Sequence, residues 1–245
     1  MDPLTAAAAS GVRSRMESLD MLANNLANAS TGGFKVDHEF YSSFIDPESR
    51  NSSGGSNGEM PVVQKPWTDF SQGTLQQTGH PLDLALTGAG FFTVNGPSGP
   101  LYTRNGSFQL SSTGVLTTAE GYPVRLKDGT TLQLTPGSIP VINAQGDVSE
   151  EGRALGTLAI TDFKDPGKLS KAGATYFKAA PDAVRTPATN AEVHQSALEN
   201  SNVVTAEAAI RLVTVMRHFE GLQKAITVAT QMNQSSITEV ARITS

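Results

Sequence analysis

Residues 202–243 read NVVTAEAAIRLVTVMRHFEGLQKAITVATQMNQSSITEVARI, and apolar or small side chains recur there at every third or fourth position. This alternation places one side of a long α-helix in a seam, as a coiled coil requires. The seam comprises Thr205, Ala208, Leu212, Val215, Phe219, Leu222, Ile226, Ala229, Asn233, Ser236, Val240 and Ile243. Thr205 can cap the start, and Glu207 suits the positive end of the helix dipole. We expect one helix of roughly 60 Å, at about 1.5 Å per residue.

The other end of the chain carries a second seam with the same spacing. It comprises Leu4, Ala8, Val12, Arg15, Leu19, Leu22, Leu26 and Ala29, widened by Met16 and Ala23. Gly32 and Gly33 end this helix, because glycine readily adopts the left-handed conformation found at helix ends. Small residues fill many positions of both seams, so an isolated pair buries little apolar area. We therefore predict a helical hairpin, formed by the two chain ends, that packs fully only against other copies of the protein.

The middle of the chain follows a different pattern. Residues 46–65 are rich in Ser and Gly and predict a solvated loop, with an inter-subunit contact as the alternative. From Trp67 to about Arg185, short runs with a period of two are separated by Gly, Pro and Asn turns, and Asn105-Gly106 and Asp128-Gly129 are strong hairpin signals. The predicted class is α+β: long terminal helices forming a coiled-coil-like hairpin, with an inserted antiparallel β domain. The predicted regions are an N-terminal helix (1–32), an extended or loop connector (33–70), a β-rich outer domain (71–190) and a C-terminal helix (191–245).

Bulk composition restricts the partners. The formal net charge is −5, and the sequence pI is about 5.4, which does not favour a nucleic-acid or anionic-membrane partner. The chain has no cysteine, so disulfide and thiol chemistry are excluded. It has no apolar run of membrane-spanning length and no start typical of a cleaved signal peptide. We expect any export to use another route.

The motifs of catalysis and cofactor binding are absent from the sequence. No GxSxG, GxxxxGK[ST] or HExxH pattern occurs, and Gly88-Ala-Gly90 leads into two phenylalanines where a dinucleotide loop would lead into a helix. Asp37-His38-Glu39 cannot all face one ion on regular structure, because neighbouring residues point in different directions. The sequence therefore predicts no catalytic residues, no cofactor and no metal site, and a protein that is not an enzyme.

Four stretches resemble the bacterial flagellar basal-body rod and hook protein family. They are LANNLANASTGGFK at 22–35, GTLQQTGHPLDLALTGAGFFTV at 73–94, YTRNGSFQL at 102–110 with GYPV at 121–124, and LENSNV at 198–203 with RHFE at 217–220 and KAI at 224–226. They cover nearly the whole chain in the family's order. The residues taken as the family signature are Asn24, Asn25, Leu26, Ala27, Asn28, Gly33, Phe34, Leu198, Glu199, Ser201, Asn202 and Val203. One departure is Ser196, where the family usually has Gly.

The resemblance implies a structural subunit of the basal-body rod that polymerises helically into the hollow drive shaft carrying torque from motor to hook. It implies self and other rod or hook subunits as partners, together with the flagellar type III export apparatus and chaperone-like factors. Nucleic acid and membrane insertion are not expected. The implied location is the flagellar basal body, in the periplasmic space of a Gram-negative cell, reached without a cleaved signal peptide. Length and a single modest β domain favour a rod subunit over the longer hook protein, and the Arg217–Glu220 motif resembles the proximal-rod member more closely than the distal one.

Assembly is predicted to order both chain ends, because neither seam alone offsets about 1–2 kcal/mol per ordered residue. The subunit packing is assigned to Leu19, Leu22, Leu26, Leu212, Val215, Phe219, Leu222 and Ile226. Three alternatives remain: a distal-rod or hook-type subunit of the same family, a β-rich cell-wall-binding module with a coiled-coil stalk, and a peptidoglycan hydrolase joined to the rod. The cell-wall module needs exposed aromatic residues on one β face.

Overall fold

The computed structural model describes residues 3–44, 60–135 and 137–243, and it contains both helices and sheets, as the predicted α+β class requires. The chain forms two compact units. We call the first the helical unit; it comprises Met1–Ala27, Asp37–Trp67 and Val204–Ser245. We call the second the β unit; it comprises Asn28–Val36 and Thr68–Val203. Each unit is therefore built from segments that lie far apart in the sequence.

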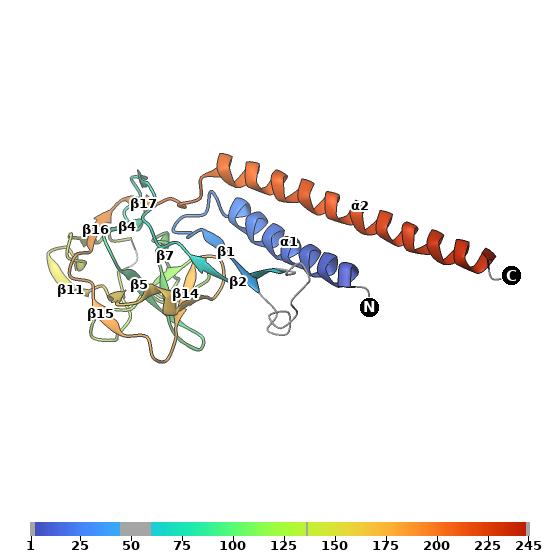
Figure 1. The fold of residues 1–245 in the computed structure, drawn as a ribbon. Coiled ribbons are helices and arrows are strands. Elements are labelled where there is room, and N and C mark those ends of the chain that lie inside the picture. Colours follow the sequence, from blue (N-terminus) through green and yellow to red (C-terminus); the bar gives the residue numbers. More distant parts are fainter. Residues whose placement is uncertain (1–2, 45–59, 136, 244–245) are drawn as a thin grey trace. The chain divides into compact units, whose positions relative to one another are not determined.

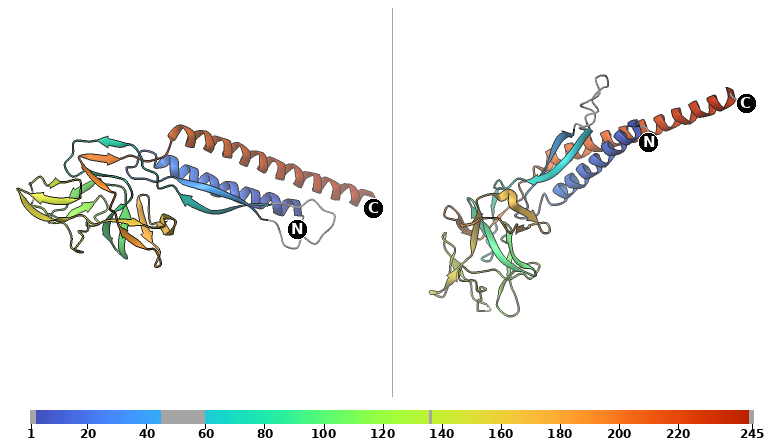
Figure 2. Two further views of the ribbon diagram at one scale, coloured as in Figure 1. Left: turned by 60° about the vertical axis from the view of Figure 1, so that its left-hand side comes forward. Right: turned by 60° about the horizontal axis from the view of Figure 1, so that its bottom comes forward.

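Two helices dominate the helical unit: α1 (Pro3–Ala27) and α2 (Thr205–Ile243). They lie side by side and run in opposite directions, so the amino end of α1 and the carboxyl end of α2 point the same way (Figures 1 and 2). Pro3 suits the first turn of a helix, where its missing N–H would have no partner inside the helix. In α2, Glu207 in the first turn pairs with Arg211 one turn later at 2.9 Å.

The seam on α1 differs from the predicted one. The side chains buried on the described part of this helix are Ser14, Ser18, Leu22 and Asn25. Of the predicted seam residues whose burial the structure describes, from Val12 onward, Leu22 alone is buried, several others are half-buried, and Met16 is 52% exposed. The predicted face of α1 was wrong because it assumed that the most apolar face of the helix is the buried one. The buried face is lined by small hydroxyl residues that allow close approach, with Gly11 near Leu222 of α2.

From Ala208 to Ile226 the seam on α2 lies where the spacing placed it, whereas Thr205 is exposed and the later seam residues lie outside the side chains that the structure describes. Six of its residues are buried or half-buried: Ala208, Leu212, Val215, Phe219, Leu222 and Ile226. The threonines elsewhere on α2 keep their hydroxyls within the helix; Thr214 and Thr227 each donate to the carbonyl four residues earlier. The helix begins at Thr205, not at the predicted boundary of 191, because residues 192–199 pair as strands of the β unit.

The helical unit also contains a two-stranded sheet of β1 (Asp37–Phe44) and β2 (Met60–Thr68). These strands lie in the region, residues 33–70, that was predicted to be an extended or loop connector. These strands form because each is the other's partner across the intervening residues, which a local pattern does not reveal. Of the predicted loop at 46–65, residues 46–59 lie outside the described part of the chain, and the rest belong to β2.

The β unit is an assembly of short, mostly antiparallel strands. Their bounds are β3 (Leu75–Gln77), β4 (Leu84–Thr87), β5 (Phe91–Gly96), β6 (Gly99–Thr103), β7 (Phe108–Leu110), β8 (Leu116–Thr118), β9 (Val141–Ile142), β10 (Asp147–Glu150), β11 (Arg153–Thr157), β12 (Ile160–Phe163), β13 (Leu169–Lys171), β14 (Tyr176–Ala179), β15 (Arg185–Pro187), β16 (Glu192–Gln195) and β17 (Ala197–Glu199). A short 3-10 turn, η2, covers Pro166–Lys168. The largest sheet has the order β13-β14-β6-β5-β12-β15.

One of the two predicted hairpin turns is correct. At Asp128-Gly129 the N–H of Leu126 donates to the carbonyl of Thr130, and the chain reverses as predicted. At Asn105-Gly106 the prediction was wrong, since β6 and β7 join different partners. An added Cβ on Gly106 would lie 1.7 Å from the Leu84 carbonyl oxygen, so this glycine allows a close backbone approach in place of a hairpin.

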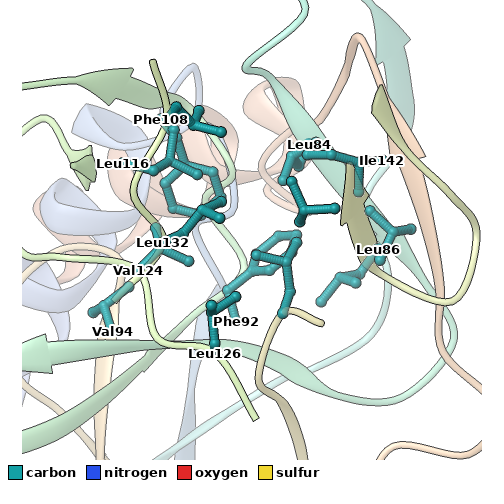
Figure 3. Close-up of a cluster of buried hydrophobic side chains, with 14 of the residues drawn as sticks. Leu84, Leu86, Phe92, Val94, Phe108, Leu116, Val124, Leu126, Leu132 and Ile142 are labelled. Atoms are coloured by element: carbon teal, nitrogen blue, oxygen red, sulfur yellow. The ribbon is translucent and has the colours of Figure 1, made fainter. Parts of the chain in front are cut away.

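The β unit has a closed apolar core. Its main cluster is drawn in part in Figure 3 and includes Leu84, Leu86, Phe92, Val94, Phe108, Leu116, Val124, Leu126, Leu132 and Ile142. A second cluster is largely aromatic and contains Phe91, Tyr102, Phe163, Leu169 and Phe177. The rings in these clusters meet edge to face, for instance Phe92 with Phe108 at 5.3 Å. Consecutive residues of β4, β5 and β8 are buried, so these short strands are covered on both faces and contribute to the interior of the β unit.

The buried junction of the chain ends and the candidate assembly surfaces

The segment that follows α1 enters the interior of the β unit at Gly33-Phe34-Lys35. Phe34 and Lys35 have no exposed surface, and the N–H of Gly33 donates to the carbonyl of Glu199 at 2.7 Å. Gly33 has a φ of +69°, and an added Cβ would lie 2.2 Å from the Asn105 nitrogen. Only glycine fits here, for both conformational and steric reasons. We call residues 28–36, 69–73 and 197–203 the chain-end junction.

A buried ion cluster occupies the chain-end junction. The ammonium of Lys35 lies 2.6 Å from one carboxylate oxygen of Glu199, and the guanidinium of Arg104 lies 3.3 Å from the other. Lys35 also donates to the Ser71 carbonyl at 2.6 Å, and the Gly73 N–H donates to Glu199 at 2.9 Å. One carboxylate therefore faces two cations, and backbone groups of Ser71 and Gly73 complete much of the hydrogen bonding, whereas the Nε of Arg104 is buried without a hydrogen-bond partner among the described residues. Such burial is tolerated only with this degree of pairing.

Burial sets the direction of the pKa shifts in the cluster. Loss of hydration lowers the pKa of Lys35 and the pKa of Arg104 from their ordinary values. The Glu199 carboxylate opposes both shifts through its charge and its hydrogen bonds. Removal of this carboxylate would leave two buried cations without their shared counter-ion.

Arg104 links the ion cluster to other segments of the β unit. Its guanidinium donates to the Gly88 carbonyl at 2.6 Å and lies 5.3 Å from the centre of the Phe91 ring. The Gln72 side chain completes the turn at Gly88: its carbonyl oxygen accepts from the Gly88 N–H, and its amide donates to the Leu86 carbonyl. Arg104 therefore connects the chain-end junction to the strand β4 and the turn after it.

Asn202 closes the other side of the chain-end junction, just before α2. Its side-chain oxygen accepts from the Val36 N–H at 2.8 Å, and its amide donates to the Asp69 carbonyl at 2.9 Å. Lys171 of β13 covers the outside: it donates to the Lys35 carbonyl at 2.7 Å and lies 4.2 Å from the centre of the Phe34 ring. The residues after α1 and before α2 are thus held together inside the β unit.

The family-signature residues fall into two groups. Gly33, Phe34, Glu199 and Asn202 build the chain-end junction, and Val203 is also buried. The others lie on α1 or just after it, or beside Glu199 in the segment that leads to α2. Asn25 is buried and exchanges two hydrogen bonds with the Asp37 backbone, Asn24 and Ala27 are exposed, and Leu26, Asn28, Leu198 and Ser201 are half-buried. Ser201 accepts from the Val203 N–H.

The residues assigned to subunit packing are only partly covered. Leu22 and Val215 are buried, and Leu19, Leu26, Leu212, Phe219, Leu222 and Ile226 remain half-buried. That they pack against neighbouring copies stays a prediction.

Sequence reasoning missed Lys35 and Arg104 as members of a site. Both stood inside the quoted motifs, Lys35 directly after Phe34 and Arg104 after Tyr102-Thr103. The sequence does carry a signal: each of these charged residues stands beside or near an aromatic residue, and large aromatic residues are often buried. The glutamate that they share lies more than 90 residues from Arg104, so no local pattern predicts the contact.

Two findings bear on the alternatives. Among the described residues, no group of three or more metal-ligating side chains is close enough to hold an ion, and no helix is long and apolar enough to cross a bilayer. The cell-wall-binding alternative needs exposed aromatic residues on a β face, but the aromatic clusters of the β unit are buried. Trp67 is half exposed and stacks on His38 in the helical unit, with ring centres 4.9 Å apart.

Three protein families match this chain in order. Residues 7–35 match the family described as "Flagella basal body rod protein", residues 85–152 match "Flagellar hook protein FlgE/F/G D1 domain", and residues 194–239 match "Flagellar basal body rod FlgEFG protein C-terminal". The first match contains Lys35 and the third contains Glu199, so the two residues that pair in the ion cluster come from different family matches.

Individual relatives agree along most of their length. The flagellar basal-body rod protein FlgF of Caulobacter vibrioides is 30% identical over 226 residues, covering 92% of each chain. The flagellar basal-body rod protein FlgG of Bacillus subtilis is 27% identical, over 93% of this chain and 95% of its own. FlgG of Borreliella burgdorferi is 29% identical, over 92% and 94%. Relatives bearing both names match nearly the whole chain.

Proposed function

The chain belongs to the family of flagellar basal-body rod proteins, and we propose that it assembles helically, with other rod and hook subunits, into a hollow shaft that transmits torque. In this proposal α1 and α2 form a coiled-coil-like hairpin in the inner layer of the tube. The β unit stands outside and contributes stiffness through lateral contacts. The family's structural role and its place in the flagellar basal body are the premise; the arrangement within the tube is our inference.

The observation that supports it is the incomplete burial of the helical unit. Ile210 and Met232 on α2 are 69% and 65% exposed, and most of the seam residues are only half-buried. Ordering a long helix costs about 1–2 kcal/mol per residue in backbone entropy, which this thin seam offsets poorly. Neighbouring copies would supply the missing apolar contact.

We further propose the route and position that the family resemblance implies. The chain would pass through the flagellar type III export apparatus, with chaperone-like factors, and reach the periplasmic part of the basal body without a cleaved signal peptide. The Arg217–Glu220 motif favours the proximal rod. Electron cryotomography of a strain lacking the gene tests the position, because loss of only the distal rod would contradict it.

Folding coupled to assembly is tested on the purified full chain. Helicity, measured by circular dichroism at 222 nm, should rise with protein concentration in parallel with polymer measured by sedimentation. Val215→Asp, in the buried seam, should suppress both increases, whereas Gln223→Asp, on an exposed position of the same helix, should leave them. Full helicity of both chain ends in a dilute monomer would contradict the proposal.

A further inference from the structure

The side of α2 that faces away from α1 carries its own regular pattern. Exposed residues follow one another there at intervals of three or four, which places them in one line along the helix. We call this line the outer face of α2; it comprises Ile210, Val213, Arg217, Glu220, Lys224 and Val228. Its ends are apolar, with Val213 49% and Val228 46% exposed, and its middle has two positive charges and one negative.

The outer face of α1 is complementary. It comprises Arg13, Met16, Glu17, Asp20, Ala23 and Ala27, all exposed. Arg13 and Glu17 pair with each other at 3.2 Å, so the net charge of this face comes from Asp20 and is negative. Met16 and two alanines give it a flat apolar surface. The outer face of α1 thus combines a net negative charge with apolar surface, and the outer face of α2 combines a net positive charge with apolar residues at its ends. The two faces are complementary in charge, and both offer apolar area.

The lengths of the helices leave room for such a contact. α2 has 39 residues and α1 has 25, so at about 1.5 Å per residue α2 is roughly 20 Å longer. Because the helices run in opposite directions, the carboxyl end of α2 continues past the first turn of α1 (Figure 2). Met232, in the carboxyl-terminal part of α2, is 65% exposed.

We propose that the outer face of α1 in one copy docks against the outer face of α2 in the next copy, with Asp20 opposite Arg217 and Lys224. The inference rests on the proposed function and specifies its subunit contact. Two different faces meet, so the contact is heterologous and repeats from copy to copy without closing. Pairing of α2 with α2 is disfavoured, because it would bring two net positive faces together.

Charge reversal in the full-length protein tests this contact. Asp20→Lys makes both outer faces positive, and Arg217→Glu with Lys224→Glu makes both negative. Each variant should need an at least about tenfold higher concentration to polymerise, as expected when attraction across a contact becomes repulsion. Lys178→Glu, exposed in the β unit, is the control for net charge and should polymerise as the original chain does.

Two rescues make the test specific. A chain with all three substitutions should regain polymerisation, because the charges are exchanged across the contact. An equal mixture of the two defective proteins should also polymerise, because each supplies the face that the other lacks. Circular dichroism of the monomers verifies that the substitutions do not alter folding.

The inference is overturned if the reversed chains polymerise normally, or if neither the triple variant nor the mixture regains polymer while the original chain polymerises. In that event the rod-subunit proposal stands, and the contact lies elsewhere. If the original chain itself forms no polymer under any condition that supports rod assembly, both proposals fall.

Discussion

The β unit and the helical unit solve the problem of burial in opposite ways. The β unit encloses side chains such as Leu84, Phe92 and Leu158 completely and also encloses three charged residues. Among the α1 side chains that the structure describes, two of the four buried ones are serines, and on α2 large apolar residues such as Ile210 remain exposed. Exposed apolar surface of this kind indicates an interaction site. The contrast supports the proposal that the β unit folds around its own core and that partner subunits complete the helical unit.

The two units also place their charges differently. In the β unit Lys35, Arg104 and Glu199 are buried and form one cluster. On the helices the ion pairs Arg13–Glu17 and Arg211–Glu207 are exposed, and each joins residues one turn apart. Exposed pairs of this kind contribute about 0.3–0.5 kcal/mol, whereas loss of one partner from a buried pair is strongly destabilising.

The largest expected effect is therefore at Glu199. Glu199→Gln keeps the shape of the side chain but leaves Lys35 and Arg104 as buried cations without a counter-ion. We expect the free energy of unfolding of the β unit to fall by about 3–5 kcal/mol, measured by chemical denaturation followed by near-ultraviolet circular dichroism. Lys35→Met, which leaves the contact between Arg104 and Glu199, should cost less. Equal stability of Glu199→Gln and the original chain would show that the cluster does not stabilise the unit.

Glycine-to-alanine substitution should have opposite signs in the two units. Gly33→Ala places a Cβ against the Asn105 backbone at a φ of +69°, so it should destabilise the β unit by about 2 kcal/mol or more. Gly11→Ala is the matched substitution on α1, where the added Cβ would lie 3.8 Å from Leu222 in ordinary contact. It should raise helicity. A stable Gly33→Ala variant would disprove the steric account of this position.

Gly221 is the corresponding position on the exposed side of α2. An added Cβ there meets nothing within 4 Å, and alanine is favoured over glycine in a helix interior by about 1 kcal/mol. Gly221→Ala should therefore increase the ellipticity at 222 nm of the dilute monomer without changing the denaturation of the β unit. An effect on the β unit would contradict the separation of the two units.

The smallest expected effect is at Ser196, which has a φ of +61°. A residue with a Cβ is strained there, but glycine loses more entropy on folding, so the net gain from Ser196→Gly should be only about 0.5–1 kcal/mol. Thermal denaturation of the β unit measures it, with Ser112→Gly, at an exposed turn position without positive φ, as the control of the same chemical change. A lower melting temperature for Ser196→Gly would show that the serine side chain stabilises the turn.

Helix patterning predicted much of the fold, because a period of three to four residues is a local property. It located α2 and its seam, and the family resemblance drew attention to Gly33, Phe34, Glu199 and Asn202. Helix patterning chose the wrong face of α1, where the buried side chains are largely small and polar, and the Asn-Gly hairpin signal failed at Gly106, whose close contact is with the Leu84 carbonyl. Strands β1 and β2 were missed because each depends on a partner distant in the sequence.

The sequence by itself determined the class of the fold, the long helix at the carboxyl end and the family, because periodicity and motif order are carried by neighbouring residues. Only the tertiary structure decided that Lys35, Arg104 and Glu199 meet in one buried cluster and that α1 presents Ser14 and Ser18 inward. The physical reason is that burial of charge depends on counter-charges and carbonyls supplied by segments far away along the chain. Those segments come together only when the chain folds.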